Sequence, residues 1–408
     1  MKERNIWFLS LVAAMGGFLF GYDTAVINGA EKEIQNVFNL SPALHGLVMS
    51  SALWGTVIGA LFGGRISDRF GRKPTLICVG ALYLLSAVWS GVAASATALF
   101  IARFIGGLGV GCSSVVAPVY IAEISPTEKR GMMTAIFQLN VVTGMCASQF
   151  INMAIAKSGA GAWRWMLGAE SVPAFLFFAL CFFLIESPRW LTEKDKLLNQ
   201  IKKPVAFWTS ANRKPIFIAI AVALFNQLSG VNAILYYMPR IYEMAGFAAS
   251  TSMTLSAMTN VFFTVGTLVG MVLIDKLGRK GLLIVGGSGY VFSLFALALS
   301  FHFGQGWAAS VCLVLFLLSH AIGQGTVIWV LIAEIFPTAV RGQGQSVGAF
   351  THWTMSAIIT LVFPIAVDKT IPEVIFGVFG AFMILHLLWA IFCVPETKGK
   401  SLEELSIR

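Results

Sequence analysis

The chain has 408 residues, of which 57% are hydrophobic and only 12% are charged, and its formal net charge is +9. Soluble globular proteins carry about 25% charged residues, so this composition excludes an ordinary soluble domain. Apolar runs of roughly 20 residues, the length that crosses ~30 Å of hydrocarbon, recur from one end of the chain to the other. We therefore predict an all-α protein that crosses the lipid bilayer many times.

The first apolar run follows a short charged start, as the core of a signal peptide does. It extends from Ile6 past Gly16 and Gly17 to Ile27, which is longer than a typical signal-peptide core of roughly 7–15 residues. We therefore expect an uncleaved first membrane span. One acid, Asp23 in the stretch FGYDTAVING, lies near the end of this run.

Hydropathy windows of about 19 residues predict twelve membrane-spanning helices. The predicted spans are 6–28, 46–66, 75–94, 97–121, 132–156, 165–186, 215–240, 252–275, 281–303, 308–333, 343–367 and 374–394. If both termini are cytoplasmic, the inner loops hold about four times as many Lys and Arg residues as the outer loops. This asymmetry predicts cytoplasmic termini in the cell membrane, and it explains the positive net charge without a nucleic-acid partner.

Two halves of the chain repeat the same motifs in the same order. SDRFGRK at 67–73 recurs about 210 residues later as IDKLGRK at 274–280, and AEISPTEKRG at 122–131 recurs as AEIFPTAVRG at 333–342. ESPR after the sixth predicted span is echoed by ETKGK after the twelfth. Parallel repeats of this kind are typical of transporters. The predicted domains are a six-helix half at 1–186, a shortened cytoplasmic linker at 187–214, a second six-helix half at 215–394 and a cytoplasmic tail at 395–408.

Acidic and basic residues gather at the inner ends of the spans, in and beside the repeated motifs. The glycine in each motif permits a tight turn in a two-turn loop, and the charges on both sides can pair across neighbouring helix ends. Such pairs can hold the inner face closed and release it when the halves move. Simple anchoring by the positive-inside rule is the alternative. The residues predicted to form this cytoplasmic gate are Asp68, Arg72, Glu123, Arg130, Asp275, Arg279, Glu334 and Arg341.

Three ionisable residues lie inside predicted spans, where a charge is costly: Asp23, Arg103 and Glu170. Asp23 and Arg103 both lie roughly 7–9 Å below the outer edge of the bilayer, so they can pair if their spans are neighbours. Burial disfavours a charged carboxylate and an adjacent guanidinium favours it, while Arg stays charged. Asp23 is therefore expected to couple proton entry to transport, with a permanent ion pair as the alternative. Glu170 is either a second proton relay group or a structural hydrogen-bonding residue.

The motifs together resemble those of the sugar porter family of the major facilitator superfamily. The duplicated DRxGRK-type loops occur with PVYIAEISPTEKRG, ESPRWL, NQLSGVNAILYY, WVLIAEIFPTAVRG and PETKGKSLEEL, in the family's order from Gly21 to Leu405. The resemblance implies alternating access of a monomer to a central monosaccharide site between its two halves. It also implies proton coupling, because proton-coupled members have Asp at the position of Asp23, where passive facilitators tend to have Asn. The linker departs from the family, whose members usually carry a longer bundle of cytoplasmic helices there.

A sugar site needs amides, which donate and accept hydrogen bonds, and aromatic rings, which cover the apolar face of the sugar. In the seventh predicted span, Gln227 and Asn232 lie roughly 140° apart on an ideal helix, so a break at Ser229–Gly230 is needed to bring them towards one cavity. By resemblance, the sugar-site residues are Phe20, Gln138, Asn226, Gln227, Asn232, Asn260, Trp329 and His352. Asn226 replaces a more usual Gln, and His352 replaces a usual Asn or Gln. Taken singly, each amide is more typical of contacts between membrane helices.

These observations predict a proton-coupled symporter of a monosaccharide, either a hexose or a pentose. A passive sugar uniporter of the same fold and, less strongly, a non-transporting sugar sensor are the alternatives. The five histidines and six cysteines form no HExxH or CxxC spacing. We therefore predict that the chain is not an enzyme and has no metal site and no cofactor.

Overall fold

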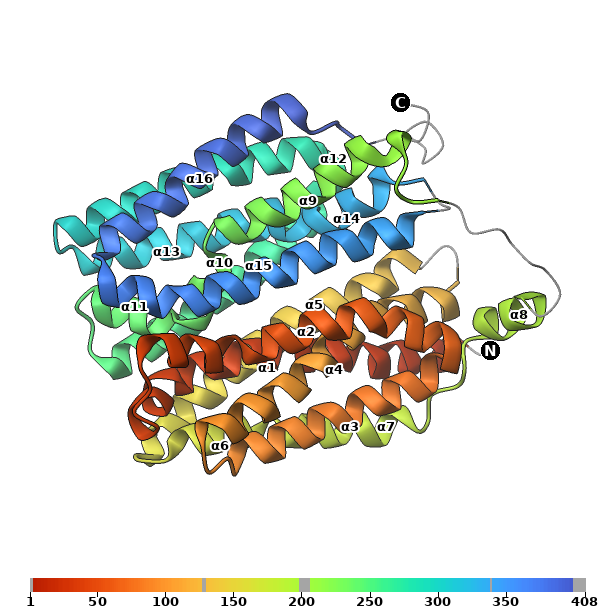
Figure 1. The fold of residues 1–408 in the computed structure, drawn as a ribbon, viewed down its shortest axis with the longest axis horizontal. Helices are drawn as coiled ribbons and strands as arrows, with labels where there is room; N and C mark the ends of the chain where they lie inside the picture. Colours follow the sequence, from red (N-terminus) through yellow and green to blue (C-terminus); the bar gives the residue numbers. More distant parts are fainter. Residues whose placement is uncertain (1–2, 127–129, 198–205, 338–339, 399–408) are drawn as a thin grey trace. The chain divides into compact units, whose positions relative to one another are not determined.

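The computed structural model describes residues 3–126, 130–197, 206–337 and 340–398, and these segments consist of helices joined mostly by short turns (Figure 1). The chain divides into two compact units, Met1–Lys203 and Pro204–Arg408, which we call unit 1 and unit 2. Each unit contains one copy of the repeated motifs.

Unit 1 is built on two closely packed helix pairs. Its helices are α1 (Glu3–Val37), α2 (Pro42–Phe70), α3 (Arg72–Gly91), α4 (Ala96–Ile124), α5 (Arg130–Ile155), α6 (Ala162–Ala169), α7 (Ser171–Cys181) and α8 (Pro188–Leu197). α1 packs mainly along α5, and α2 packs mainly along α4. The first pair approaches so closely that a Cβ on Gly17 would lie 2.7 Å from the backbone oxygen of Phe137. Small residues at such contacts let membrane helices gain van der Waals packing.

Unit 2 contains one very long helix and several interrupted ones. Its helices are α9 (Arg213–Leu228), α10 (Val231–Tyr236), α11 (Met238–Met244), α12 (Ala249–His302), α13 (Gly306–His320), α14 (Thr326–Ile335), α15 (Arg341–Lys369) and α16 (Pro372–Cys393). A π-helical segment, η3 (Ala321–Gly325), joins α13 to α14. α12 packs against α13 and α16, and α9 packs against α15. Buried apolar side chains of α9, α12, α14 and α16 form a continuous core, which includes Val222, Leu282 and Leu331.

Eleven of the described helical stretches are long and apolar enough to cross a membrane, whereas the sequence predicted twelve spans. The difference lies in α12, whose 54 residues include the predicted spans 252–275 and 281–303 and are interrupted at Gly278, with φ +78° and ψ 171°. At the matching position of the first repeat, Gly71 has φ +104° and separates α2 from α3. The expected two-turn loops are therefore wrong, because one glycine in a conformation that other residues rarely adopt makes each connection.

Three predicted spans are interrupted helices. The sixth is divided into α6 and α7 at Glu170, just before Pro173, whose missing N–H removes a helical hydrogen bond. The seventh is divided between α9 and α10, where Gly230 has φ +82°. The tenth contains η3, in which Gly323 has non-helical dihedral angles. In transporters, interrupted membrane helices are the usual places for substrate and ion sites.

The predicted linker at 187–214 is helical at both of its described ends. It begins with α8 and closes with a short 3₁₀ turn, Ser210–Asn212. Residues 198–205 of the linker and 399–408 of the predicted tail lie outside the described residues.

Candidate functional site

Asp23 and Arg103 meet in the interior of unit 1. Asp23 lies on α1 and Arg103 on α4, two helices in contact, and the two side chains are 3% and 2% exposed. Nη1 of Arg103 binds Asp23 Oδ1, and Nη2 donates to the backbone oxygen of Asp23 at 2.9 Å. Direct pairing and an additional hydrogen bond are what a buried charge requires, because breaking such a pair leaves an uncompensated ion in a medium of low dielectric.

Glu170 lies beside this pair, at the break between α6 and α7. Its side chain is buried, close to the side chains of Asp23 and Arg103. Two neighbouring carboxylates repel each other when both are ionised, and a proton on one of them relieves that repulsion. Asp23, Glu170 and Arg103 therefore place two carboxyl groups next to one fixed positive charge.

A glycine on α4 leaves space next to the carboxylate. A Cβ on Gly106 would lie 3.7 Å from Asp23 Oδ1 and closer still to the hydroxyl group of Ser86. Any larger side chain at this position would therefore press on the site. Gly106 could not be distinguished in sequence from the other 39 glycines of the chain, because its importance depends on which helix lies opposite.

A chain of amide side chains surrounds the helix break in unit 2. Gln227 Nε2 donates to Asn226 Oδ1 at 2.9 Å, and Asn232 Nδ2 donates to Gln227 Oε1 at 2.6 Å. Asn232 Nδ2 also donates to Ser356 Oγ on α15 at 2.7 Å. All three amides are buried, and the break at Gly230 brings them together. Since these amides already bind one another, a ligand that enters must exchange hydrogen bonds with them.

His352 continues this chain towards an aromatic ring. Gln227 Nε2 lies 3.3 Å from the ring nitrogens of His352. The rings of His352 and Trp329 have centres 5.1 Å apart. An imidazole nitrogen accepts a hydrogen bond from an amide only when that nitrogen carries no proton. His352 therefore acts here as an acceptor, which is one of the two roles that an amide side chain has.

The other three residues predicted for the sugar site lie on three different helices, α12, α1 and α5. Asn260 is buried on α12, and its Nδ2 donates to the backbone oxygen of Ser256 at 3.0 Å. Phe20 on α1 and Gln138 on α5 are half-buried, on the two helices that pack together in unit 1. The structure therefore brings Asn226, Gln227, Asn232 and His352 into one hydrogen-bonded group, with Trp329 against it.

Arg72 is the centre of a charged cluster at one end of unit 1. Its Nε and Nη2 donate to the two carboxylate oxygens of Glu123, at 3.0 and 2.9 Å. Its Nη1 donates to Asp68 at 2.9 Å and to the backbone oxygen of Ser67 at 3.0 Å. This two-pronged bond to Glu123 fixes the guanidinium plane, and it joins the α2–α3 connection to the end of α4.

Arg279 makes the same contacts in unit 2. Its Nε and Nη2 donate to the two carboxylate oxygens of Glu334, at 3.0 and 2.7 Å, and its Nη1 lies 3.4 Å from Asp275. Thr397 adds a hydrogen bond of 2.6 Å from its hydroxyl group to Glu334. The repeated motif therefore produces the same local network twice, each time within one unit.

Two glutamates that the sequence analysis did not assign complete these clusters. Glu186 Oε1 accepts from the backbone N–H of Arg72 at 2.9 Å, and Glu396 Oε1 accepts from that of Arg279 at 3.1 Å. The repeat of ESPR as ETKGK could have identified both glutamates as partners of the motifs. Each glutamate follows its DRFGRK-type motif at nearly the same distance in sequence. Partial burial by itself would raise the pKa of Glu396, but backbone N–H groups, including that of Lys398, bind the carboxylate and lower its pKa below the usual value.

Two other predicted gate residues begin helices. Arg130 is the first residue of α5, and its side chain lies outside the described part of the chain. Arg341 is the first residue of α15 and is half-buried.

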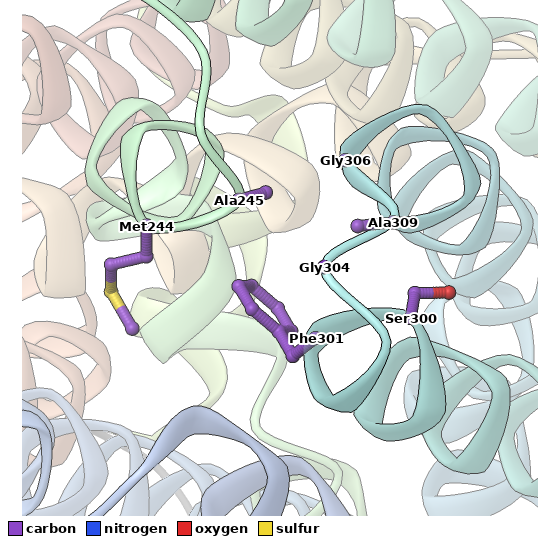
Figure 2. Close-up of a pocket in the computed structure, with 7 residues that line it drawn as sticks. All are labelled: Met244, Ala245, Ser300, Phe301, Gly304, Gly306 and Ala309. Carbon is purple, nitrogen blue, oxygen red and sulfur yellow. The ribbon is translucent and has the colours of Figure 1, made fainter.

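A small pocket opens in unit 2 where α11 ends near the turn between α12 and α13 (Figure 2). Its lining residues are Met244, Ala245, Ser300, Phe301, Gly304, Gly306 and Ala309. None of these residues was predicted for the sugar site, and Ser300 is the one hydroxyl-bearing residue among them. Among the described residues, no group of three His, Cys, Asp or Glu side chains is placed to hold a metal ion.

Comparison with known proteins identifies the family. The profile of the family described as "Sugar (and other) transporter" matches the chain twice, over residues 9–206 and 200–407. The two matches follow the division into unit 1 and unit 2.

Full-length relatives support this match. The arabinose-proton symporter of Bacillus subtilis is 34% identical to this chain, over 97% of this chain and 93% of its own length. The D-xylose-proton symporter of Escherichia coli is 31% identical, over 99% and 96%. The glucose transporter GlcP of Staphylococcus epidermidis is 32% identical, over 99% and 97%.

The fold agrees with that of a solved transporter. The inward-open xylose transporter XylE from E. coli matches with a TM-score of 0.88 and 30% sequence identity, over 98% of this chain and 99% of its own. The all-α membrane fold and the family predicted from the motifs are thereby confirmed. The chain belongs to the sugar porter family of the major facilitator superfamily, whose members are multi-pass membrane transporters.

Proposed function

We propose that this protein is a proton-coupled symporter of a monosaccharide that works by alternating access. The observation that carries the proposal is the buried contact between Asp23 and Arg103, with the carboxyl group of Glu170 beside it. Two relatives named as sugar-proton symporters, for the pentoses arabinose and xylose, support proton coupling. These two relatives and the glucose transporter GlcP support a pentose or hexose as the substrate class.

Asp23 is the group that takes up the proton in this mechanism. As a carboxylate it binds Arg103 and links α1 to α4. Protonation removes the negative charge, while the guanidinium stays charged and loses most of its attraction to that oxygen. Glu170 offers a second carboxyl group within reach, to which the proton can pass. α1 and α4 are then less tightly linked, so that proton binding changes the free-energy balance between conformations.

The neutral sugar is bound by hydrogen bonds and ring contacts. We assign sugar contacts to Phe20, Gln138, Asn226, Gln227, Asn232, Asn260, Trp329 and His352, and cytoplasmic gating to the clusters around Arg72 and Arg279. The hydrogen-bonded amide group in unit 2 supports the first assignment, since amides can exchange their mutual bonds for bonds to sugar hydroxyls. We further propose a monomer in the lipid bilayer of the cell membrane, with both termini cytoplasmic.

Reconstitution into liposomes with an inward proton gradient tests this function. Wild-type protein should accumulate a labelled pentose or hexose above equilibrium, and a proton ionophore should abolish the accumulation. Asp23→Asn should lose accumulation but keep sugar exchange at zero gradient, because the sugar contacts remain. The matched control Asp368→Asn removes an exposed acid at the end of α15 and should behave as wild type.

Two outcomes would contradict the proposal. Accumulation by Asp23→Asn equal to that of the wild type would exclude Asp23 as the coupling group. Wild-type protein that only equilibrates the sugar, with no effect of the ionophore, would identify a passive uniporter.

A further inference from the structure

Glu31 and His45 form a buried contact in unit 1 that the proposed transport mechanism does not use. Glu31 Oε2 lies 2.8 Å from His45 Nε2, and the side chains are 2% and 0% exposed. Glu31 lies near the end of α1, and His45 lies in the first turn of α2, so both are at the outer edges of the spans predicted at 6–28 and 46–66. The pair is therefore enclosed by protein yet close to the outer solution.

This contact joins α1 to α2, two helices that otherwise touch little. α1 packs mainly along α5, and α2 mainly along α4, while the contacts between α1 and α2 are few. A buried ionisable pair is expensive to desolvate, and apolar residues of similar size would stabilise such a position equally well or better. The presence of two ionisable groups is thus better explained by their ability to change charge than by stability.

Glu31 is positioned to act on Asp23 through α1. The two residues are separated by a little over two helical turns, which places them about 80° apart around the helix and about 12 Å apart along its axis. A charge at that distance is screened less in the protein interior than in water. A change of charge at the outer pair is therefore felt at Asp23.

The other charged residues near this end are exposed or bound to other groups. On α1, α5 and the elements packed against them, the remaining ionisable residues towards this end are Lys32, Glu33, Cys146, Lys157 and Arg164, with Arg103 and Glu170 further inward. Glu33 accepts from the backbone N–H groups of Gly161 and Trp163, and Arg164 donates to the backbone oxygen of Ala93 at 2.7 Å. Lys32 and Lys157 are exposed. Water therefore screens the two lysines, whereas Glu31 and His45 are enclosed.

We propose that Glu31 and His45 form a second proton-binding site, which exchanges protons with the outer solution and whose charge acts on Asp23. This site rests on the proposed symport and on the proposed orientation of the chain. Each proton bound raises the net charge of the pair by one unit. A carboxylate beside a neutral imidazole (−1) becomes an ion pair (0), or an ion pair becomes a carboxylic acid beside an imidazolium (+1). The pair thereby adjusts the pH range over which the transporter loads its proton.

Single-charge variants give opposite expectations. Glu31→Gln removes an anion near Asp23, so the pH of half-maximal proton-driven uptake should fall by about 0.5–1 unit. His45→Gln removes a group that carries positive charge when protonated, so that pH should rise. The double variant should return close to the wild type, and Lys32→Gln, an exposed neighbour on α1, should leave the profile unchanged. Unshifted profiles in both single variants would overturn the proposal.

A direct proton titration keeps the proposal testable if a single variant folds poorly. On acidification, purified wild-type protein in lightly buffered detergent should bind more protons than the double variant Glu31→Gln/His45→Gln, because the ionisable pair is absent from the variant. Equal proton uptake would overturn the second site. A wild type that shows this extra proton uptake but no proton-driven sugar accumulation would instead contradict the proposed symport and leave the site standing.

Discussion

Asn232 Nδ2 donates a 2.6 Å hydrogen bond to Gln227 Oε1 across the break between α9 and α10. On a continuous helix these two side chains would point in directions roughly 140° apart. Gly230, with φ +82°, turns the chain between them and makes the bond possible. The local backbone conformation at one glycine therefore determines whether the amides form a single group.

Gly230→Ala should disrupt this group. An added Cβ would meet the Phe379 ring at 2.5 Å, and alanine disfavours the left-handed conformation by about 1–2 kcal/mol. We expect a lower melting temperature of the purified protein and at least a tenfold weaker sugar affinity, measured by thermal unfolding and equilibrium binding. Gly377→Ala on α16, where a Cβ would meet nothing within 4 Å, is the control. A variant at Gly230 that binds sugar as tightly as the wild type would show that the break is not required.

The sequence predicted this break and the amides beside it because both depend on residues close together in the chain. Ser229–Gly230 interrupts an apolar run, and the amides lie within the same short motif. The possible pairing of Asp23 with Arg103 could also be predicted, since a charge in a membrane span needs a partner and both residues lie at a similar depth. The repeat likewise predicted that the clusters around Arg72 and Arg279 would be built alike.

Other features depend on which helices lie opposite one another, and a single sequence does not give that. Glu170 lies near Asp23 because α6 and α7 pack beside α1. The pairing of Glu31 with His45 joins α1 to α2 across a turn, and neither residue stands inside a predicted span. The loops at the repeated motifs were expected to be longer, because hydropathy alone does not show that one glycine is sufficient for the turn.

His352→Gln should retain transport, since glutamine can accept the hydrogen bond that His352 now accepts from Gln227. His352→Leu should weaken sugar affinity by about tenfold, because leucine cannot make the hydrogen bond to sugar proposed for His352, a loss of about 1–3 kcal/mol. Equilibrium binding of the transported sugar, compared between the two variants, checks this. If His352→Leu binds as well as His352→Gln, the ring contributes only packing against Trp329.

Glu396→Gln should change how stability depends on pH. The lowered pKa of Glu396 means that its carboxylate contributes stability above the usual pKa of Glu, and that this stability is lost as the pH falls through the lower folded value. The variant should therefore melt a few degrees below the wild type at pH 7, and the difference should shrink as the pH approaches 4. Melting curves across this range test it, with Asp368→Asn as the control. A difference that is constant with pH would exclude the carboxylate as the cause.

Arg72→Lys should destabilise unit 1 more than Arg279→Lys destabilises unit 2. Lysine keeps the positive charge but cannot reproduce the two-pronged bond to Glu123, so we expect a loss of about 1–3 kcal/mol. The side chain of Arg72 is 7% exposed and that of Arg279 is 13% exposed, and the contact of Arg279 with Asp275 is the longer one, at 3.4 Å. Water can therefore replace more of the hydrogen bonds that Arg279→Lys removes than of those that Arg72→Lys removes.

Thermal unfolding of both variants in the same detergent measures the difference, and Arg213→Lys, at an exposed arginine that begins α9, is the control. If the two arginines were only positive-inside anchors, all three variants would melt with the wild type, because lysine satisfies that rule as well as arginine does. A larger loss at Arg279 would show instead that burial is not what sets the strength of the two clusters.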